Sequence, residues 1–392
     1  MTHALSMLAL VTDGFGGRGG IAQYNRDFLS ALVEVGAASS ILVLPRYAPD
    51  PVAPPSGITQ AGPRPSRFGY CAAVLYAMLR HRVDVVFCGH LYMAPLAALI
   101  ARLKGAKLII QAHGIEAWSR PSRLCPSAIE AADIVLCGSR YTRGCILGWS
   151  GVTSERILVL PNTVDEAFTP GDGSLLRDAW GLQGKRVLLT VGLMDRRWQY
   201  KGHDRVIAAI PELLLRGHDV VYVVVGEGDD QPRLAALANK RGVGDRVRFM
   251  GAVSRQTLID AYRIADLFLM PSTGEGFGIA FLEAMASGTP ALGLAVAGAR
   301  DALADGELGI AVTEDDLPAA IERALGDARS DPNALASATR ARFGRKPFAA
   351  SVRRVIDRLM EGCRTCLTEP NGTTLTVAVK PGDALSSARS ER

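Results

Sequence analysis

Residues 271–290 read PSTGEGFGIAFLEAMASGTP, and this stretch indicates both a fold and a binding site. Residues 265–270 before it form a short apolar run of strand length. Residues 278–287 have helical spacing that stops at a Gly-Thr-Pro sequence. The stretch therefore predicts a strand, a loop that contains Glu275 and a helix whose second turn contains Glu283. In an open parallel sheet such a loop lies at the carboxyl end of the strand, where ligands bind.

The start of this helix suits an anion, because its first amides have no partner within the helix and the helix dipole favours negative charge there. A carboxylate accepts two hydrogen bonds side by side, so each glutamate suits a vicinal diol, with Glu275 on a sugar and Glu283 on a ribose. An acidic helix start without a ligand is the alternative. Four residues carry the amides expected to face a diphosphate: Gly276, Phe277, Gly278 and Ile279.

The sequence EGFGIAFLEA at residues 275–284 resembles the E-x7-E element of retaining glycosyltransferases of family four, also called group 1. The resemblance covers residues 5–360 approximately. It implies the GT-B fold, in which two Rossmann-like, doubly wound α/β domains face each other across a cleft. It also implies a nucleoside-diphosphate sugar as donor, UDP- or GDP-linked, and no metal ion or other cofactor.

Length and composition agree with two α/β domains. The chain has 392 residues, 48% of them apolar and 21% charged, and strand-like and helix-like segments alternate. It has no uncharged apolar run of 18 or more residues, and the apolar part of residues 1–14 is too short for a signal peptide. We therefore expect a cytoplasmic protein. The net charge of +5 comes without a basic stripe interleaved with aromatic residues, which argues against nucleic-acid binding.

The cysteines predict reduced thiols and no metal site. Their number, seven, is odd, and most lie in apolar segments. Cys363 and Cys366 form a lone C-x-x-C without a second pair or a nearby histidine, so we do not expect zinc there. The sequence also lacks a D-x-D triad for a hard cation.

The N-terminal half has a glycine-rich loop. Residues 5–12 read as a buried strand, residues 13–20 as the loop DGFGGRGG and residues 21–35 as a helix. Glycines let a backbone approach a ligand closely, although a flexible turn without a ligand would look the same. The loop resembles the first loop of family four, which implies that Gly19 and Gly20 border the donor phosphate and the acceptor.

A histidine follows a strand in the same half. Residues 107–111 read as a strand, and His113 comes just after it. This position resembles the active-site histidine of the family, which implies that His113 donates a hydrogen bond to the donor sugar or its phosphate, or steadies developing positive charge through its ring or backbone carbonyl. A structural histidine is the alternative.

The second doubly wound unit carries a cationic loop, GLMDRRWQYKG at residues 192–202. The family has an Arg just after the strand and a Lys-Gly pair at the helix start, and both cations clamp the diphosphate. Lys201 matches the lysine, but Leu193 stands at the arginine position. We expect Arg196, in preference to Arg197, to supply the second cation.

The expected division of the chain has five parts. They are an acceptor-side Rossmann-like domain at 1–170, a linker at 171–185, a nucleotide-sugar domain at 186–342, a closing helix at 343–362 that packs back on the first domain, and a disordered tail at 363–392.

Residues 64–82 contain an apolar helix with basic ends. Arg64 and Arg67 precede the apolar segment 68–79, and Arg80 and Arg82 follow it. Such a helix suits the anionic surface of the inner membrane leaflet, while a core helix with solvated ends is the alternative.

The expected activity is a metal-independent retaining hexosyltransferase acting on a glycan or lipid-linked acceptor, in bacterial exopolysaccharide or glycolipid assembly. The expected catalytic residues are His113, Arg196, Lys201 and Glu275. Asp301 stands where the family has the Glu of a GG-x-x-E pattern, which implies a changed backbone near the phosphates. A non-catalytic partner of another transferase and a sugar-nucleotide epimerase of the same fold are the alternatives.

Overall fold

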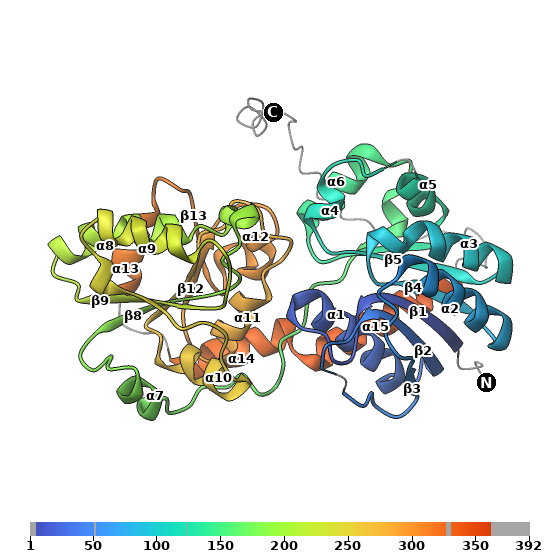
Figure 1. Cartoon of the computed structure of the whole chain (residues 1–392), viewed down its shortest axis with the longest axis horizontal. Coiled ribbons are helices and arrows are strands. Elements are labelled where there is room, and N and C mark those ends of the chain that lie inside the picture. Colours follow the sequence, from blue (N-terminus) through green and yellow to red (C-terminus); the bar gives the residue numbers. More distant parts are fainter. Residues whose placement is uncertain (1–4, 51, 123, 327–330, 362–392) are drawn as a thin grey trace, which may run out of the picture.

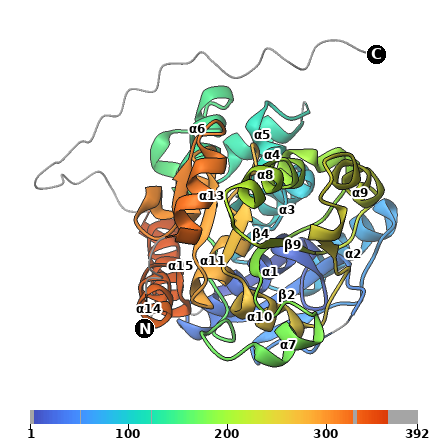
Figure 2. The same cartoon turned by 90° about the vertical axis from the view of Figure 1, so that its left-hand side faces the viewer.

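The computed structural model describes residues 5–50, 52–122, 124–326 and 331–361, which form two α/β domains (Figure 1). Turning the molecule by 90° brings the second domain in front of the first (Figure 2). The expected tail at 363–392, with the C-x-x-C pair, lies outside the described residues.

The first domain is built on a parallel sheet in the order β3-β2-β1-β4-β5-β6-β7. The inner strands β4 and β6 are buried at every residue, as expected where helices cover both faces of a parallel sheet. The strands are β1 (Leu5–Asp13), β2 (Ala38–Tyr47), β3 (Ile58–Gln60), β4 (Val85–Cys88), β5 (Lys107–Ala112), β6 (Ile134–Cys137) and β7 (Ile157–Val159). The helices are α1 (Gly19–Glu34), α2 (Arg67–Arg80), α3 (Ala94–Lys104), α4 (Ile115–Trp118), α5 (Leu124–Ala131) and α6 (Arg140–Trp149).

The second domain has a parallel sheet in the order β10-β9-β8-β11-β12-β13. Its strands are β8 (Arg186–Val191), β9 (Val220–Val225), β10 (Val247–Phe249), β11 (Leu267–Met270), β12 (Ala291–Leu294) and β13 (Ile310–Val312). Its helices are α7 (Ser174–Ala179), α8 (His203–Leu215), α9 (Gln231–Lys240), α10 (Arg255–Ile264), α11 (Ile279–Ala286), α12 (Ala299–Ala302), α13 (Leu317–Gly326) and α14 (Pro332–Phe343). The predicted two-domain, doubly wound α/β fold is confirmed.

In each sheet the strand order reverses at one point, between β1 and β4 in the first domain and between β8 and β11 in the second. Ligands of doubly wound sheets bind outside the carboxyl ends of the strands at this reversal. The loops that follow these strands contain the glycine-rich segment, the Lys201 segment and the Glu275 segment. The topology therefore selects the same loops as the sequence.

A helix at the end of the described chain ties the domains together. Helix α15 (Arg345–Glu361) follows α14, and Figure 1 shows α14 and α15 in red-orange. Helix α15 packs against α1 of the first domain. Phe348 and Val352 of α15 are buried in the core of the first domain. Arg345 bonds Glu34 of α1 at 2.7 Å. Helix α15 is therefore part of the core of the first domain.

The segment expected as a linker is folded onto the second domain. Residues 171–185 contain α7, and Leu182 is fully buried in that domain's core. Val164 and Phe168, placed in the first domain by the sequence, belong to the same core. The many glycines suggested a linker because composition does not show that the leucines between them pack.

Candidate active site

Lys201 and Glu275 lie beside each other at the carboxyl ends of β8 and β11. The Lys201 Nζ is 3.4 Å from the Glu275 Oε2, and the two side chains are 14% and 17% exposed. Gly202, which follows Lys201, has φ +80°, and a Cβ there would collide with the carbonyl oxygen of Pro271. Glycine at this position thus lets the helix start approach the neighbouring strand end, which places the lysine against the Glu275 loop.

The Glu275 loop also touches the first domain through its backbone. A Cβ on Gly276 would collide with the carbonyl oxygen of His113, and one on Gly114 would lie 2.7 Å from the Gly276 Cα. The Glu275 carbonyl accepts a hydrogen bond from the Gly298 amide at 2.9 Å. The loop is therefore held from both sides, by the first domain and by the segment after β12.

The start of α11 offers free amides. Gly278, with φ +95°, precedes the helix, and Phe277 is buried against Phe343 with ring centroids 5.8 Å apart. None of the amides of residues 276–279 donates a hydrogen bond to another described residue. Unpaired donors at a helix start suit an anion. The expected diphosphate-binding amides are thus placed together beside Lys201 and Glu275.

Glu283 is buried on α11 with a neutral partner. It is 7% exposed, and the hydroxyl of Tyr262, from α10, donates to its Oε2 at 2.7 Å. Burial raises the pKa of Glu283 to about 7, although the hydrogen bond from Tyr262 acts in the opposite direction. A carboxylate in this position has one oxygen outside the Tyr262 bond, which is available to a further donor such as a diol.

His113 has its ring engaged within the protein. The His113 Nε2 lies 2.9 Å from the Gly89 carbonyl, which can only accept, so Nε2 carries the hydrogen. Burial lowers the pKa of His113. In the neutral ring Nδ1 can only accept a hydrogen bond. The ring therefore has no hydrogen to give to the sugar of a nucleotide sugar while Nε2 bonds the Gly89 carbonyl. The His113 amide donates to Glu116 at 2.6 Å, and its carbonyl faces Gly276.

Gly19 and Gly20 begin α1 opposite the start of α11. Gly19 has φ +83°, and a Cβ on Gly20 would lie 4.0 Å from Ile279. Two helix starts, one from each domain, therefore face each other. This arrangement brings the expected glycines close to the amides of α11.

The loop between β8 and Lys201 contains three side chains of interest. Leu193 is 53% exposed. Arg197 pairs with Asp195, while the exposed Arg196 side chain forms no ion pair or hydrogen bond with another described residue. Arg196 is thus available to an anionic ligand, whereas Arg197 is engaged.

Asp301 joins the two domains. Its carboxylate accepts from the amide of Arg140 at 3.1 Å and from the guanidinium of the same arginine. Arg140, on α6, also bonds Asp305 at 2.6 Å. Burial raises the pKa of Asp301, and Arg140 opposes that shift. Asp301, whose side chain is one methylene shorter than the Glu of the family pattern, is therefore bound by Arg140 of the first domain.

Two contributors were missed by sequence reasoning. Tyr262 lies on the buried face of α10, and helical spacing alone predicts a core position there but no partner. Arg140 is 161 residues from Asp301, so no local pattern connects them. Within the described residues, no group of His, Cys, Asp and Glu side chains is arranged to hold a metal ion.

Comparisons with known proteins identify the family of this chain. The model of the family "Glycosyl transferases group 1" matches residues 175–346, and that of "Glycosyltransferase Family 4" matches residues 18–168. The chain is 32% identical over 277 residues to a GDP-mannose-dependent alpha-(1-6)-phosphatidylinositol monomannoside mannosyltransferase of Mycolicibacterium smegmatis, covering 66% of this chain and 70% of that protein. It is 30% identical over 315 residues to D-inositol 3-phosphate glycosyltransferase 1 of Catenulispora acidiphila, covering 74% of each.

Solved structures show the same fold. HepE of Anabaena in complex with UDP superposes with a TM-score of 0.73 at 19% identity, over 90% of this chain and 100% of that one. Sucrose-phosphate synthase of Thermosynechococcus elongatus gives a TM-score of 0.72 at 21% identity, over 91% and 100%.

Proposed function

Because the chain belongs to the group 1 glycosyltransferases and transfers a sugar from a nucleotide sugar, we propose a retaining, metal-independent hexosyl transfer from a UDP- or GDP-linked donor. The proposed acceptor is a glycan or a lipid-linked glycan of bacterial exopolysaccharide or glycolipid assembly. The transfer would take place on the cytoplasmic face of the membrane.

The observation that carries the proposal is the Lys201–Glu275 contact beside the free amides of α11. A transferred sugar needs its leaving diphosphate neutralised while its hydroxyls are held. Lys201, Arg196 and the amides of residues 276–279 supply positive charge and donors for the diphosphate. Glu275 supplies an acceptor for the sugar hydroxyls.

The mechanism follows from which groups are left for the reaction. A covalent route needs a carboxylate beneath the anomeric carbon, whereas Glu275 and Glu283 are assigned to diols. We favour attack from the face on which the diphosphate leaves. The bond from the anomeric carbon to the phosphate oxygen breaks, the acceptor oxygen bonds to the same face, and the acceptor proton passes to the departing phosphate. The His113 carbonyl, which faces Gly276, is suited to steady the positive charge that develops.

The relatives support a lipid-borne acceptor, since one is named for a phosphatidylinositol monomannoside. The same relative is named for GDP-mannose, whereas a neighbour of the same fold was solved with UDP. Both bases therefore stay in the proposal.

The direct test is donor turnover with and without chelator. A panel of UDP- and GDP-sugars is incubated with the enzyme, and release of nucleoside diphosphate is followed with and without acceptor. We expect one donor to be consumed at an unchanged rate in excess EDTA, with the anomeric configuration kept in the product. Loss of turnover in EDTA that Mg²⁺ or Mn²⁺ restores would refute the charge scheme.

One observation favours a second candidate, a non-catalytic partner of another transferase. Leu193 is exposed at the position where the family has an arginine. Such a partner would bind a nucleotide without turnover. Consumption of any donor by the purified chain excludes it, and product analysis on donor alone also tests the epimerase alternative.

A further inference from the structure

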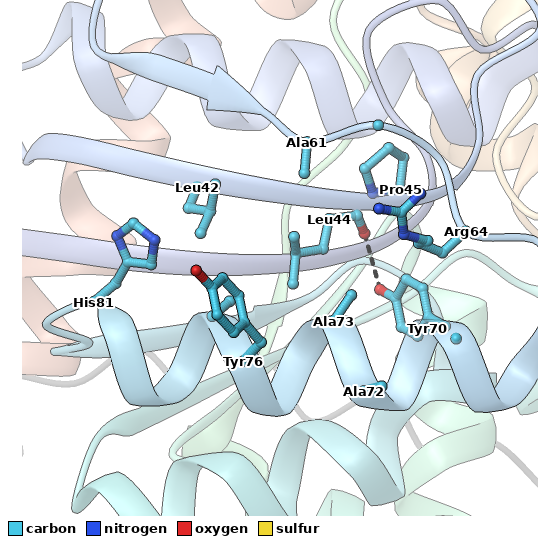
Figure 3. A pocket seen from close by; sticks show the side chains of 13 residues that line it. Leu42, Leu44, Pro45, Ala61, Arg64, Tyr70, Ala72, Ala73, Tyr76 and His81 are labelled. Atoms are coloured by element: carbon cyan, nitrogen blue, oxygen red, sulfur yellow. Dashed lines mark hydrogen bonds between the residues drawn. The ribbon is translucent and has the colours of Figure 1, made fainter.

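The first domain contains an apolar cavity that the reaction does not use. It has a volume of about 480 Å³ and lies between α2 and β2, as Figure 3 shows. Small-molecule sites are roughly 300–1,000 Å³ in volume. The cavity is therefore large enough for a ligand, and mainly carbon atoms line it: Leu42, Leu44, Ala61, Ala73, Tyr76 and Ala77 are among its residues.

The cavity exists because small residues face one another across it. On α2 the lining positions recur at helical spacing and carry no side chain longer than a methyl group except at two tyrosines. Ala61 and Gly62 lie on the opposite wall. Tyr70 closes the floor, because its hydroxyl donates to the Leu44 carbonyl at 2.8 Å.

The cavity runs along α2 between two polar ends. Arg64 stands at one end and His81 at the other (Figure 3). The Arg64 amide bonds the carbonyl of Pro45, near the carboxyl end of β2. That edge of the sheet also carries the loop with Gly19 and Gly20. The Arg64 end of the cavity is thus on the side of the candidate active site.

The surroundings of the cavity are cationic. Residues 51–115 contain one acidic residue, Asp84, and it pairs with Arg82 at 2.9 Å. Three arginines around α2 form no ion pair with another described residue: Arg64, Arg67 and Arg80. A second copy of this chain would bring like charges together at this face, and a neutral apolar ligand would leave the arginines unused. An anionic amphiphile would place its apolar chain in the cavity and its negative charge at the arginines.

Large apolar side chains are exposed outside the cavity lining on α2 and on its neighbour α3. On α2, Phe68 is 90% exposed and Leu79 is 77% exposed. Leu99 and Leu103 are exposed on α3, which neighbours α2 (Figure 1). Exposed apolar groups beside arginines are typical of surfaces that bind membranes peripherally. No helix among the described residues is long and apolar enough to cross a bilayer.

We propose that this cavity binds one acyl chain of an anionic membrane phospholipid, with Arg64, Arg67 and Arg80 at the lipid headgroups. The proposal extends the proposed function, since a first domain held at a membrane would meet a lipid-linked acceptor there. It does not depend on that function, because it concerns binding at a site away from Lys201 and Glu275.

The first test uses lysophosphatidylglycerol, which has one chain and an anionic head, below its micelle-forming concentration. Native mass spectrometry should show one lipid bound to the full chain. Ala73→Phe fills the cavity and should weaken binding at least ten-fold. Cys71→Phe adds the same group on the exposed side of α2, outside the cavity lining, and should bind as the wild type does. The proposal would be overturned if Ala73→Phe bound the lysolipid as tightly as the wild type. It would also be overturned if the wild type formed a dimer that Ala73→Phe abolished, because the cavity would then be an interface between two copies.

The second test uses vesicles of phosphatidylglycerol and phosphatidylcholine, with vesicles of pure phosphatidylcholine as the uncharged control. One Lys or Arg near an anionic surface contributes about five-fold to binding, so Arg64→Ala with Arg80→Ala should lower partition into the mixed vesicles roughly 30-fold. Equal partition into both vesicle types would overturn the charge argument.

Donor hydrolysis without lipid separates this proposal from the proposed function. The Ala73→Phe and arginine variants should keep the wild-type rate. If the wild type consumes no donor yet binds the lysolipid, the proposed function fails alone. If Ala73→Phe abolishes transfer to a lipid-linked acceptor and the wild type binds no lysophosphatidylglycerol, the cavity belongs to the acceptor and the phospholipid assignment is wrong.

Discussion

Glu275 and Glu283 are eight residues apart, yet their surroundings differ in charge. Glu275 lies in a loop with Lys201 at 3.4 Å, whereas Glu283 is buried on a helix with the neutral hydroxyl of Tyr262 at 2.7 Å. A cation stabilises a partly buried carboxylate, but a neutral donor only partly replaces lost water. Burial accordingly raises the pKa of Glu283 to about 7.

Because of this difference, we expect replacement of each glutamate to change a different property of the protein, even if both hold diols. In the proposed mechanism Glu275 shares its site with the cation that the leaving diphosphate also needs, so we expect its replacement to affect the reaction. Glu283 can gain or lose a proton near neutral pH, so its replacement affects stability and nucleotide binding in a pH-dependent way. Glu283→Ala should weaken nucleotide binding, while Glu275→Ala should mainly slow transfer.

The largest effect is expected from removing the cation. Lys201→Ala should lower kcat about 10²- to 10³-fold, the range for loss of one preorganised electrostatic contact. Lys185→Ala is the matched control, because Lys185 pairs with Asp219 at 2.6 Å at the surface, where ion pairs contribute little. Steady-state kinetics with the preferred nucleotide sugar measures both. A similar loss in both variants would contradict a specific role for Lys201.

The next effect concerns Glu283 and pH. The folded protein binds this proton more tightly than the unfolded chain, because the folded pKa is about 7 and the ordinary value is 4.5. The stability of the wild type relative to Glu283→Gln should therefore fall as pH rises from about 4.5 to about 7, by roughly 3 kcal/mol in total. Urea unfolding at pH 5 and pH 8 measures this difference.

Tyr262→Phe sharpens the same experiment. It removes the donor that favours the ionised carboxylate, so the pH-dependent loss should extend to higher pH than in the wild type. A difference between wild type and Glu283→Gln that is the same at both pH values would show that burial does not shift this proton.

The sequence predicted the fold, and the resemblance placed Lys201 and Glu275 in one site without predicting the contact between them. The predicted strand 107–111 lies within β5, because a largely buried apolar run has few alternative pairings. The predicted helix 278–287 encloses α11, since Gly278 and the Gly-Thr-Pro sequence delimit it. The position of Lys201 was predicted because Lys201 and Gly202 resemble the Lys-Gly pair of the family.

The surroundings of Glu283 and Asp301 did not follow from the sequence, because they depend on tertiary contacts. Tyr262 reaches Glu283 only when α10 packs beside α11, and Arg140 reaches Asp301 only when the domains meet. Likewise, the bond from the His113 ring to the Gly89 carbonyl joins the loops after two neighbouring strands, so no local sequence signal predicts it. The roles assigned to the site residues stay predictions.

A smaller effect is expected from the backbone contact that holds the Glu275 loop against the first domain. Gly276→Ala introduces a Cβ against the His113 carbonyl, and overpacking of this kind costs about 1–3 kcal/mol. The domains should separate, which small-angle scattering would report as a larger radius of gyration. Gly144→Ala is the control, because open space surrounds its Cβ position on α6. An unchanged radius with unchanged stability would show that the contact does not hold the loop.

The smallest effect is expected at the second cation of the phosphate clamp. Arg196 is exposed and unpaired among the described residues, while Arg197 is engaged by Asp195, so Arg196→Ala should lower turnover about ten-fold and Arg197→Ala should not. Leu193→Arg should gain little, because a charge there would duplicate that of Arg196. Turnover and nucleoside-diphosphate affinity of the three variants decide the question. If both arginine variants are silent while Leu193→Arg raises activity strongly, the native site lacks its second cation. The non-catalytic partner would then explain this chain better than an efficient transferase, and the contrast between the two glutamates would describe a nucleotide-binding site alone.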